Sequence, residues 1–265
     1  MLDIRGSVAV ITGGAQGIGL ALAEYWVAGG GKVVLADVSE ERLEEAKKSL
    51  ESLGGEAVVL TCNVVSEADC SWLAQKAIEI FGKINMVAPC AGITRDSPVL
   101  DTDKETGKVI GKMSLENFQI VMNINLTGVF LTVRECVEQM INHDCRGLVC
   151  LISSTSSLGA AEQLNYSSSK AALSVAPRVL TAEFFRRGLA GRIRCVAVAP
   201  GYVDTSLARG GMNGKLIGKA VDQVPIGRLI DPYEIASLVG ELYRNEALAG
   251  DVYYIHGGLR LGSKG

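Results

Sequence analysis

Short runs of β-branched residues alternate with longer stretches of helical periodicity along almost the whole chain, and this alternation restricts the fold more than any other feature. Alternating strands and helices are typical of a parallel sheet covered by helices on both faces. We therefore predict an α/β fold, in which a three-layer, doubly wound parallel sheet of the Rossmann type forms a single domain over residues 1–265. The predicted strands are Ser7–Thr12, Lys32–Asp37, Ala57–Cys62, Ile84–Pro89, Gly147–Ser154, Arg194–Ala199 and Asp251–Ile255, and the predicted helices are one that ends at Trp26 and those at Glu40–Leu53, Glu67–Phe81, Leu115–Met140, Tyr166–Arg187 and Pro232–Asn245.

Two segments interrupt the alternation. Residues 94–113 form a polar insertion, far longer than the usual ~2–6 residues of such a connection, and they are either a solvated surface hairpin or part of the substrate site. Residues 206–224 are rich in glycine, which favours a substrate lid because glycine hinges suit a moving segment. Within the helix predicted over 166–187, Pro177 is expected to cause a bend or a local break.

Composition limits the classes of partner. Lys and Arg number 26 against 29 for Asp and Glu, so the chain lacks the basic excess that favours nucleic acid. No apolar stretch approaches the ~18–20 residues that span a bilayer, so no membrane partner is expected. The seven cysteines contain no CxxC pair and only two histidines accompany them, which argues against a metal site or a disulfide framework. A reducing cytoplasm is the expected location.

A glycine-rich turn, TGGAQGIG at residues 12–19, lies between the first predicted strand and the first helix. Gly13, Gly17 and Gly19 have the spacing that allows a sharp turn, close approach to a pyrophosphate and tight helix packing. The helix that follows offers free N–H groups to phosphates. The alternative is a tight turn without a ligand, but the strand–turn–helix context favours a dinucleotide.

Asp37 ends the second predicted strand, 18 residues after Gly19. A carboxylate at about this distance is typical of a bond to the adenine-ribose 2′-hydroxyl, and it would repel a 2′-phosphate. Gln16 adds no positive charge. Both residues predict a preference for NAD(H), with NADP(H) as the less favoured cofactor. An alternative role for Asp37 is to cap the next helix, in competition with Ser39.

Tyr166 and Lys170 lie four residues apart in YSSSK, so on a helix they share one face. A lysine ammonium close by would lower the pKa of the tyrosine and suit it to acid–base catalysis. Ser153 or Ser154, at the end of the preceding strand, could hold the substrate oxygen. A competing pattern is Ser167-x-x-Lys170 of serine acyl-enzymes, but its companion motifs are missing.

Together these motifs resemble the classical short-chain dehydrogenase/reductase family, and the resemblance covers nearly the whole chain. NINLTG, ISS, YSSSK, PGYVDT, PIGRLIDPYEIA and HGGLRL are similar to family motifs in the same order, and AGITRD (91–96) resembles the 3-oxoacyl-carrier-protein and acetoacetyl-CoA reductase branch most. This resemblance implies a homotetramer, and that branch usually takes NADPH.

The resemblance also implies roles for individual residues. Tyr166 would donate or accept the proton, Lys170 would bind the nicotinamide ribose, Ser154 would orient the substrate oxygen and Asn125 would hold a relay water. The residues expected to bind the cofactor are Gly13, Gln16, Gly17, Ile18, Gly19, Asp37, Asn63, Val64, Cys90, Ala91, Gly92, Tyr166, Lys170, Pro200, Gly201, Val203 and Thr205.

The chain departs from the family pattern at four places. Cys90 replaces a usual asparagine, Asn63 a usual aspartate and His256 another aspartate, while the usual serine-to-tyrosine spacing of 13 fits Ser153 better than Ser154. We select Ser154 on the ISS motif and the strand register. Cys90 is either a small buried hydrophobe or a redox-sensitive thiol.

The sequence thus predicts an NAD(H)-dependent oxidoreductase that interconverts a secondary alcohol and a ketone, acting on a small alcohol or ketone or on an acyl thioester. It would be a 3-oxoacyl thioester reductase or a 3-hydroxyacyl dehydrogenase. The alternative is a catalytically silent dinucleotide-binding or redox-sensing protein. The physiological substrate and the direction of the reaction stay open.

Overall fold

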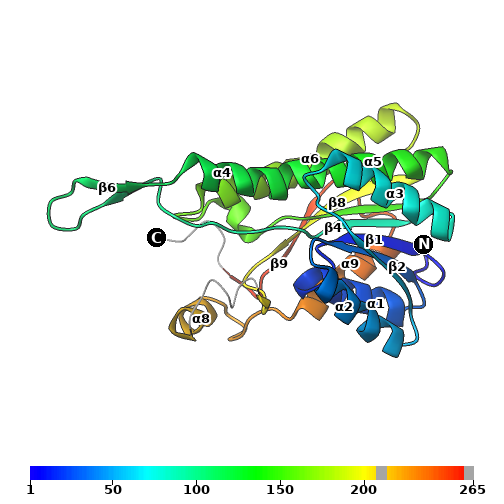
Figure 1. Ribbon diagram of the computed structural model, residues 1–265, viewed down its shortest axis with the longest axis horizontal. Coiled ribbons are helices and arrows are strands. Elements are labelled where there is room, and N and C mark those ends of the chain that lie inside the picture. The colour runs from blue at the N-terminus through cyan, green and yellow to red at the C-terminus, as the bar shows by residue number, and fades with distance from the viewer. Residues whose placement is uncertain (207–213, 260–265) are drawn as a thin grey trace.

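A seven-stranded parallel sheet forms the centre of the computed structural model, which describes residues 1–206 and 214–259 (Figure 1). Its strand order is β3-β2-β1-β4-β7-β8-β9, and each strand pairs in parallel with its neighbours. The strands are β1 (Val8–Thr12), β2 (Lys32–Asp37), β3 (Glu56–Thr61), β4 (Met86–Pro89), β7 (Gly147–Ile152), β8 (Ile193–Pro200) and β9 (Val252–Ile255). The predicted single-domain α/β fold is confirmed.

Helices cover both faces of the sheet (Figure 1). On one face lie α1 (Gly17–Ala28), α2 (Glu40–Ser52) and α9 (Pro232–Arg244), and on the other lie α3 (Glu67–Phe81), α5 (Gly128–Asn142) and α6 (Leu164–Arg186). Serine or aspartate caps at α2, α3 and α9 begin these helices close to the expected residues. The strand order reverses between β1 and β4, where α/β sheets bind ligands beside the carboxyl ends of the strands.

The helix expected over Leu115–Met140 is divided. α4 (Leu115–Met122) and α5 are joined by a π-helical turn, η1 (Asn123–Thr127), which contains Asn125. The combined run Leu115–Asn142 is long and apolar enough to cross a membrane by length and composition, so the expectation that no stretch reaches this length needs correction. Half of its most apolar part is buried inside the fold.

The helix that contains Pro177 does not break. α6 is assigned as one continuous helix from Leu164 to Arg186, and Pro177 is buried within it. The expected local break is therefore wrong, and packing of α6 on the sheet keeps the helix together across the proline.

The polar insertion folds into an antiparallel hairpin of β5 (Leu100–Thr102) and β6 (Val109–Lys112), which projects from the body beyond α4 (Figure 1). All strand residues except Gly111 are exposed, so the structure agrees with the solvated hairpin. Of the segment expected as a lid, residues 207–213 lie outside the described residues, and α8 (Gly214–Val221) follows them.

Candidate active site

The turn between β1 and α1 leaves no room for side chains at two of its glycines. Gly13 has a φ of +62°, and a Cβ there would lie 2.6 Å from the backbone nitrogen of Ala91. A Cβ on Gly19 would lie 2.4 Å from the carbonyl oxygen of Gly13. The N-terminus of α1 receives no side-chain cap from Gln16. The first residues of α1 line a cavity, and a helix N-terminus at that place fits a pyrophosphate.

That cavity has a volume of about 300 Å³ and runs from the glycine-rich turn to the end of β3. It brings together most of the residues expected to bind the cofactor, namely Gly13, Gln16, Gly17, Ile18, Gly19, Asp37, Asn63, Val64, Cys90, Ala91, Gly92 and Thr205. Sequence reasoning missed Ser39, Arg42 and Cys62, which line it as well. The position of Arg42 in the first turn after Asp37 was a signal that could have identified it.

Asp37 lines this cavity at the end of β2. Its Oδ1 accepts the N–H groups of Val38, at 2.8 Å, and of Ser39, at 3.2 Å. Its Oδ2 accepts the N–H of Ala15 at 3.4 Å, which ties the strand end to the glycine-rich turn. The residue that caps α2 is Ser39, whose Oγ accepts the N–H of Arg42. The alternative in which Asp37 is the helix cap is therefore wrong.

A second cavity, of about 260 Å³, adjoins the first, and Ile18, Cys90, Gly92 and Thr205 line both. Ser154, Tyr166 and Lys170 meet in this catalytic cavity from the end of β7 and the first turns of α6. The remaining predicted cofactor residues, Pro200, Gly201 and Val203, line it after β8.

The structure distinguishes the two serines. Ser153 donates its hydroxyl to the carbonyl of Lys170 at 2.8 Å and shares a second bond with Ser174, so it holds β7 to α6. Ser154 instead forms a hydrogen bond with the hydroxyl of Tyr166, and its Oγ accepts the N–H of Ser156. Alternation along the strand directs only one of the two towards the reacting position.

Burial governs the charges of the catalytic pair. It raises the pKa of Tyr166, a nearby Asp96 carboxylate raises it further, and the hydrogen bond from Ser154 opposes both. Burial lowers the pKa of Lys170 to about 8. The lysine Nζ donates to the carbonyl of Ile152 at 2.7 Å and lies 5.6 Å from the centre of the tyrosine ring. The expected depression of the tyrosine pKa by lysine is therefore wrong for this structure, in which desolvation is the largest cause and raises the pKa of Tyr166.

Asn125 is fully buried in the π-helical turn, a feature that is frequent at functional sites. Its Oδ1 accepts the N–H of Ile93 and its Nδ2 donates to the carbonyl of the same residue, both at 2.9 Å. The side chain therefore fixes the loop that follows β4 beside Lys170. Its expected part in holding a relay water stays a prediction.

The departures from the family pattern are accommodated locally. Burial raises the pKa of Cys90 to about 12, so this thiol is protonated at neutral pH. The backbone of His256 lies against Gly201, where a Cβ would approach the histidine Cα to 3.0 Å. Asn63 accepts the N–H of Val65 and donates its own N–H to Asp69. The competing Ser-x-x-Lys pattern gains nothing, because Lys170 donates to Ile152.

Two joined cavities at the carboxyl ends of a doubly wound sheet, one with a glycine-rich turn and one with a Ser–Tyr–Lys cluster, define a nucleotide-dependent oxidoreductase. The model of the short chain dehydrogenase family matches residues 7–213, and the chain belongs to this family. It is an enzyme that interconverts an alcohol and a ketone with a nicotinamide dinucleotide, and nothing supports the catalytically silent alternative.

Similar proteins agree with the resemblance seen in the sequence. The chain is 31% identical to a 3-oxoacyl-[acyl-carrier-protein] reductase of Thermotoga maritima over 97% of this chain and 99% of that protein. It is 35% identical to 3-hydroxyacyl-CoA dehydrogenase type-2 of Rattus norvegicus, over 98% of this chain and 97% of that protein. A crystal structure of a short-chain type dehydrogenase/reductase from Mycobacterium marinum superposes with a TM-score of 0.87 at 26% identity, covering 97% and 96% of the two chains.

Proposed function

We propose that the chain is an NAD(H)-dependent oxidoreductase that oxidises a 3-hydroxyacyl thioester or reduces the corresponding 3-oxoacyl thioester. The observation that carries this proposal is the Ser154–Tyr166 hydrogen bond beside the buried Lys170, in a cavity continuous with the glycine-rich turn. The names of the similar reductase and dehydrogenase support the thioester class.

The residues divide the chemistry between them. In the direction of oxidation, the Tyr166 oxygen takes the proton of the substrate hydroxyl, and Ser154 donates a hydrogen bond to the same substrate oxygen. The Lys170 ammonium stabilises the phenolate through the low-dielectric site. A bound nicotinamide supplies the hydride acceptor for this direction and the hydride donor for reduction. Asn125 holds Ile93 and thus one wall of the cavity.

Several polar side chains line the catalytic cavity on the side away from the glycine-rich turn. Asp96 accepts a hydrogen bond from Gln163 at 2.6 Å, and Thr94, Ser156 and Tyr202 lie around them. This lining supports a substrate that brings hydrogen-bond donors close to its reacting carbon, as the amides of a thioester arm would. The Asp96 carboxylate disfavours a free acid at the same place.

The preference for NAD(H) follows from Asp37. Its carboxylate lies where a 2′-phosphate would bring a second negative charge, and Gln16 offers no compensation. Arg42 in the same cavity is the group that would attract such a phosphate. Titration of protein fluorescence should show tighter binding of NADH than of NADPH, and Asp37→Ala should reduce this difference. Tighter binding of NADPH by the unaltered protein would refute the preference, and Arg42→Ala would then identify the phosphate ligand.

The outer face of α5 and α6 supports assembly into a homotetramer. It holds an apolar groove of about 710 Å³ with Phe130, Val175 and Val179 all about half exposed or more. Arg134, Glu138, Glu183 and Arg187 at the groove have balanced charges that suit a second copy. Light scattering after gel filtration should show a tetramer that Val175→Arg reduces in size. A monomer of unaltered protein would refute this assembly.

A cytoplasmic location belongs to the same proposal. All seven cysteines are free thiols, which suits a reducing compartment. A fractionation in which the protein accompanies membranes would contradict it, and the apolar run Leu115–Asn142 would then be the segment to examine.

The activity is tested with a panel of secondary alcohols and of 3-hydroxyacyl and 3-oxoacyl thioesters, followed by NADH absorbance. The unaltered protein should turn over thioesters best, and Tyr166→Phe should lose at least about 1,000-fold in kcat/KM. Equal inactivity of both proteins across the panel would overturn the proposed function.

A further inference from the structure

A single asparagine connects the catalytic tyrosine to two other parts of the fold. Asn165 precedes Tyr166 and is completely buried. Its Oδ1 accepts the backbone N–H of Tyr166 at 2.8 Å. Its Nδ2 donates to the carbonyl of Arg95, in the loop after β4, at 3.0 Å and to the carbonyl of Asn117, in α4, at 3.2 Å. Both donor positions and one of the two acceptor positions are thus used.

The bond to Tyr166 satisfies a need at the start of α6. The first N–H groups of a helix have no partner within the helix, and Gln163 at the cap position makes no side-chain bond to them. Asn165 supplies that acceptor from inside the first turn. Since a partly buried N–H without a partner is unfavourable, this contact holds the backbone of Tyr166 in one place.

Two further bonds join the same loops. The N–H of Ser97 donates to the carbonyl of Glu162 at 2.9 Å, and Gln163 bonds to Asp96. Glu162 adopts a φ of +64°, which is uncommon for a residue with a side chain. The loop after β4 and the start of α6 therefore form one wall, and Thr94, Asp96 and Gln163 from this wall line the catalytic cavity.

We infer that Asn165 is a positioning residue for the redox reaction, which holds Tyr166 against Ser154 and fixes the 94–97 loop as the substrate wall. The inference rests on the proposed role of Tyr166 in proton transfer. Asn165 does not line the cavity, so it acts through Tyr166 and the loop. A displacement of about 1 Å at the reacting atoms can lower a rate by roughly 100-fold, so a small shift of this wall is enough.

Two variants separate the bond to Tyr166 from the two bonds to the carbonyls of Arg95 and Asn117. Asn165→Ala removes all three, and we expect kcat to fall roughly 10- to 100-fold. The hydrogen bond from Ser154 lowers the pKa of Tyr166. If Asn165→Ala lets Tyr166 move away from Ser154, the pKa of Tyr166 should rise. The pH at which the rate of oxidation increases should then also be higher. Asn165→Asp keeps an oxygen that can accept the N–H of Tyr166. Its second oxygen replaces the Nδ2 donor and lies against the carbonyl oxygens of Arg95 and Asn117, which it repels. This variant should raise KM for the thioester more than it lowers kcat, with NADH affinity within about twofold of the unaltered protein.

Asn85 provides a matched control at the opposite end of the sheet. It also bridges two segments, since its Oδ1 accepts the N–H of Val8 and its Nδ2 donates to the carbonyl of Arg146. Asn85→Ala should lower Tm while kcat and the pH profile of the folded enzyme stay unchanged. If Asn165→Ala keeps both kcat and the pH profile, or if Asn85→Ala lowers kcat equally at an equal loss of Tm, the inference is wrong.

Should Asn165→Ala fail to fold, Asn165→Asp decides, because unchanged KM and kcat in that variant also overturn the inference. Tyr166→Phe is measured in parallel. Activity retained by Tyr166→Phe would refute the proposed function itself, whereas activity lost there but retained in both Asn165 variants would refute only the positioning role.

Discussion

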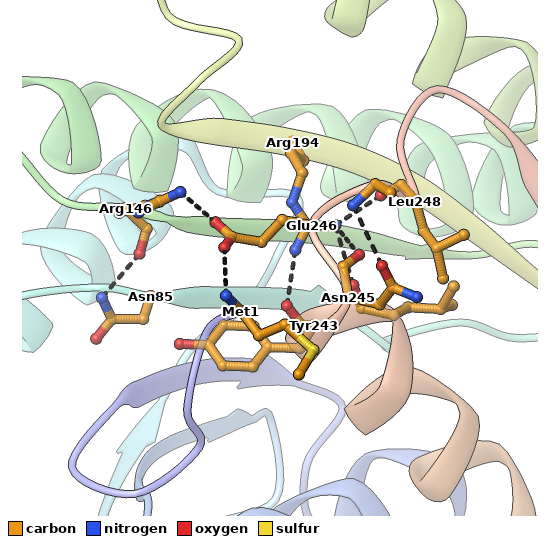
Figure 2. Close-up of polar contacts among 10 residues, drawn as sticks. Met1, Asn85, Arg146, Arg194, Tyr243, Asn245, Glu246 and Leu248 are labelled. Carbon is orange, nitrogen blue, oxygen red and sulfur yellow. Dashed lines mark hydrogen bonds and ion pairs between the residues drawn. The ribbon is translucent and has the colours of Figure 1, made fainter.

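Two cations at opposite ends of the strands have nearly the same exposed fraction, 6% for Lys170 and 7% for Arg194. Lys170 lies at the carboxyl ends of the strands and, within residues 1–206 and 214–259, has one side-chain hydrogen bond, to the carbonyl of Ile152. Arg194 begins β8 at the amino ends. Its guanidinium donates to the carbonyls of Leu242, Tyr243, Asn245 and Leu248 (Figure 2).

The four acceptors of Arg194 lie at the end of α9 and in the turn after it, where a helix dipole favours positive charge. In Figure 2, Glu246 lies next to this cluster and pairs with Arg146 and with the amino group of Met1. The hydrogen bonds of Arg194 at the amino ends of the strands therefore join β8 to the end of α9. Among the described residues, the Lys170 ammonium has fewer hydrogen-bond partners than Arg194 and is available for chemistry. The comparison teaches that partners, more than exposed fraction, separate a structural cation from a catalytic one.

Removal of the Lys170 charge should have the largest effect on activity and should not lower stability. For Lys170→Met we expect kcat/KM to fall at least about 1,000-fold, because the phenolate loses its stabilising charge. The free energy of unfolding should stay equal or rise by about 1–4 kcal/mol, since an apolar side chain replaces a desolvated charge. Turnover and urea unfolding measure the two quantities, and a variant that is active but unstable would break the comparison.

Arg194→Met should show the reverse behaviour. It removes a donor from the buried carbonyls of Leu242 and Tyr243 and from the partly buried carbonyls of Asn245 and Leu248. A buried group that loses its partner costs about 1–3 kcal/mol, partly recovered by relaxation. We expect a loss of about 3–5 kcal/mol and a fall in Tm of roughly 10 °C. Calorimetry and assays well below the transition test this result, with kcat expected within about twofold. A large fall in kcat of the folded variant would contradict the assignment of Arg194 to stability.

The pH dependence of stability should distinguish the two cations once more. The pKa of Lys170 is about 8 in the folded protein against 10.5 as its ordinary value. Between these values the unfolded chain binds more protons, so stability rises with pH, and the cost of burying Lys170 is complete below pH 8. The advantage of Lys170→Met over the unaltered protein should therefore shrink by about 3 kcal/mol at most as pH rises through this window.

Arg194 is the control for that experiment, since a guanidinium stays protonated throughout the range. The stability difference between Arg194→Met and the unaltered protein should be independent of pH in the same window. A constant difference for Lys170→Met as well would show that the lysine keeps its ordinary pKa when buried.

The sequence predicted the fold because its signals are local. Alternating strands and helices, capping serines and the glycine-rich turn each specify a short segment, and together they define a doubly wound sheet. The cluster of Ser154, Tyr166 and Lys170 was also accessible, since strand alternation and helical spacing determine which side chains share a face.

Features that depend on distant partners could not be predicted. The acceptors of Arg194 are backbone carbonyls 48 to 54 residues away, and carbonyls carry no sequence signature. Asn125, in the π-helical turn, is bonded to Ile93, 32 residues earlier, and no local pattern indicates that contact. The pKa of Tyr166 rises because surrounding elements exclude water, a consequence of packing that the spacing of Tyr166 and Lys170 does not contain.

Cys90 provides the smallest and most discriminating test, because it lies at the reactive edge but should itself be inert. Burial raises its pKa to about 12, so little thiolate exists at neutral pH and alkylation should be slow. We expect the unaltered protein to keep its activity within about twofold after treatment with iodoacetamide or hydrogen peroxide at pH 7.5. Cys90→Ser should keep its activity to the same extent. Mass spectrometry of the peptide that contains Cys90 identifies any modification. Rapid inactivation that Cys90→Ser abolishes would instead reveal an activated thiol. Cys90 would then be a third reactive group at the carboxyl ends of the strands, beside Tyr166 and Lys170. Oxidation of its thiol could then control the activity of this site.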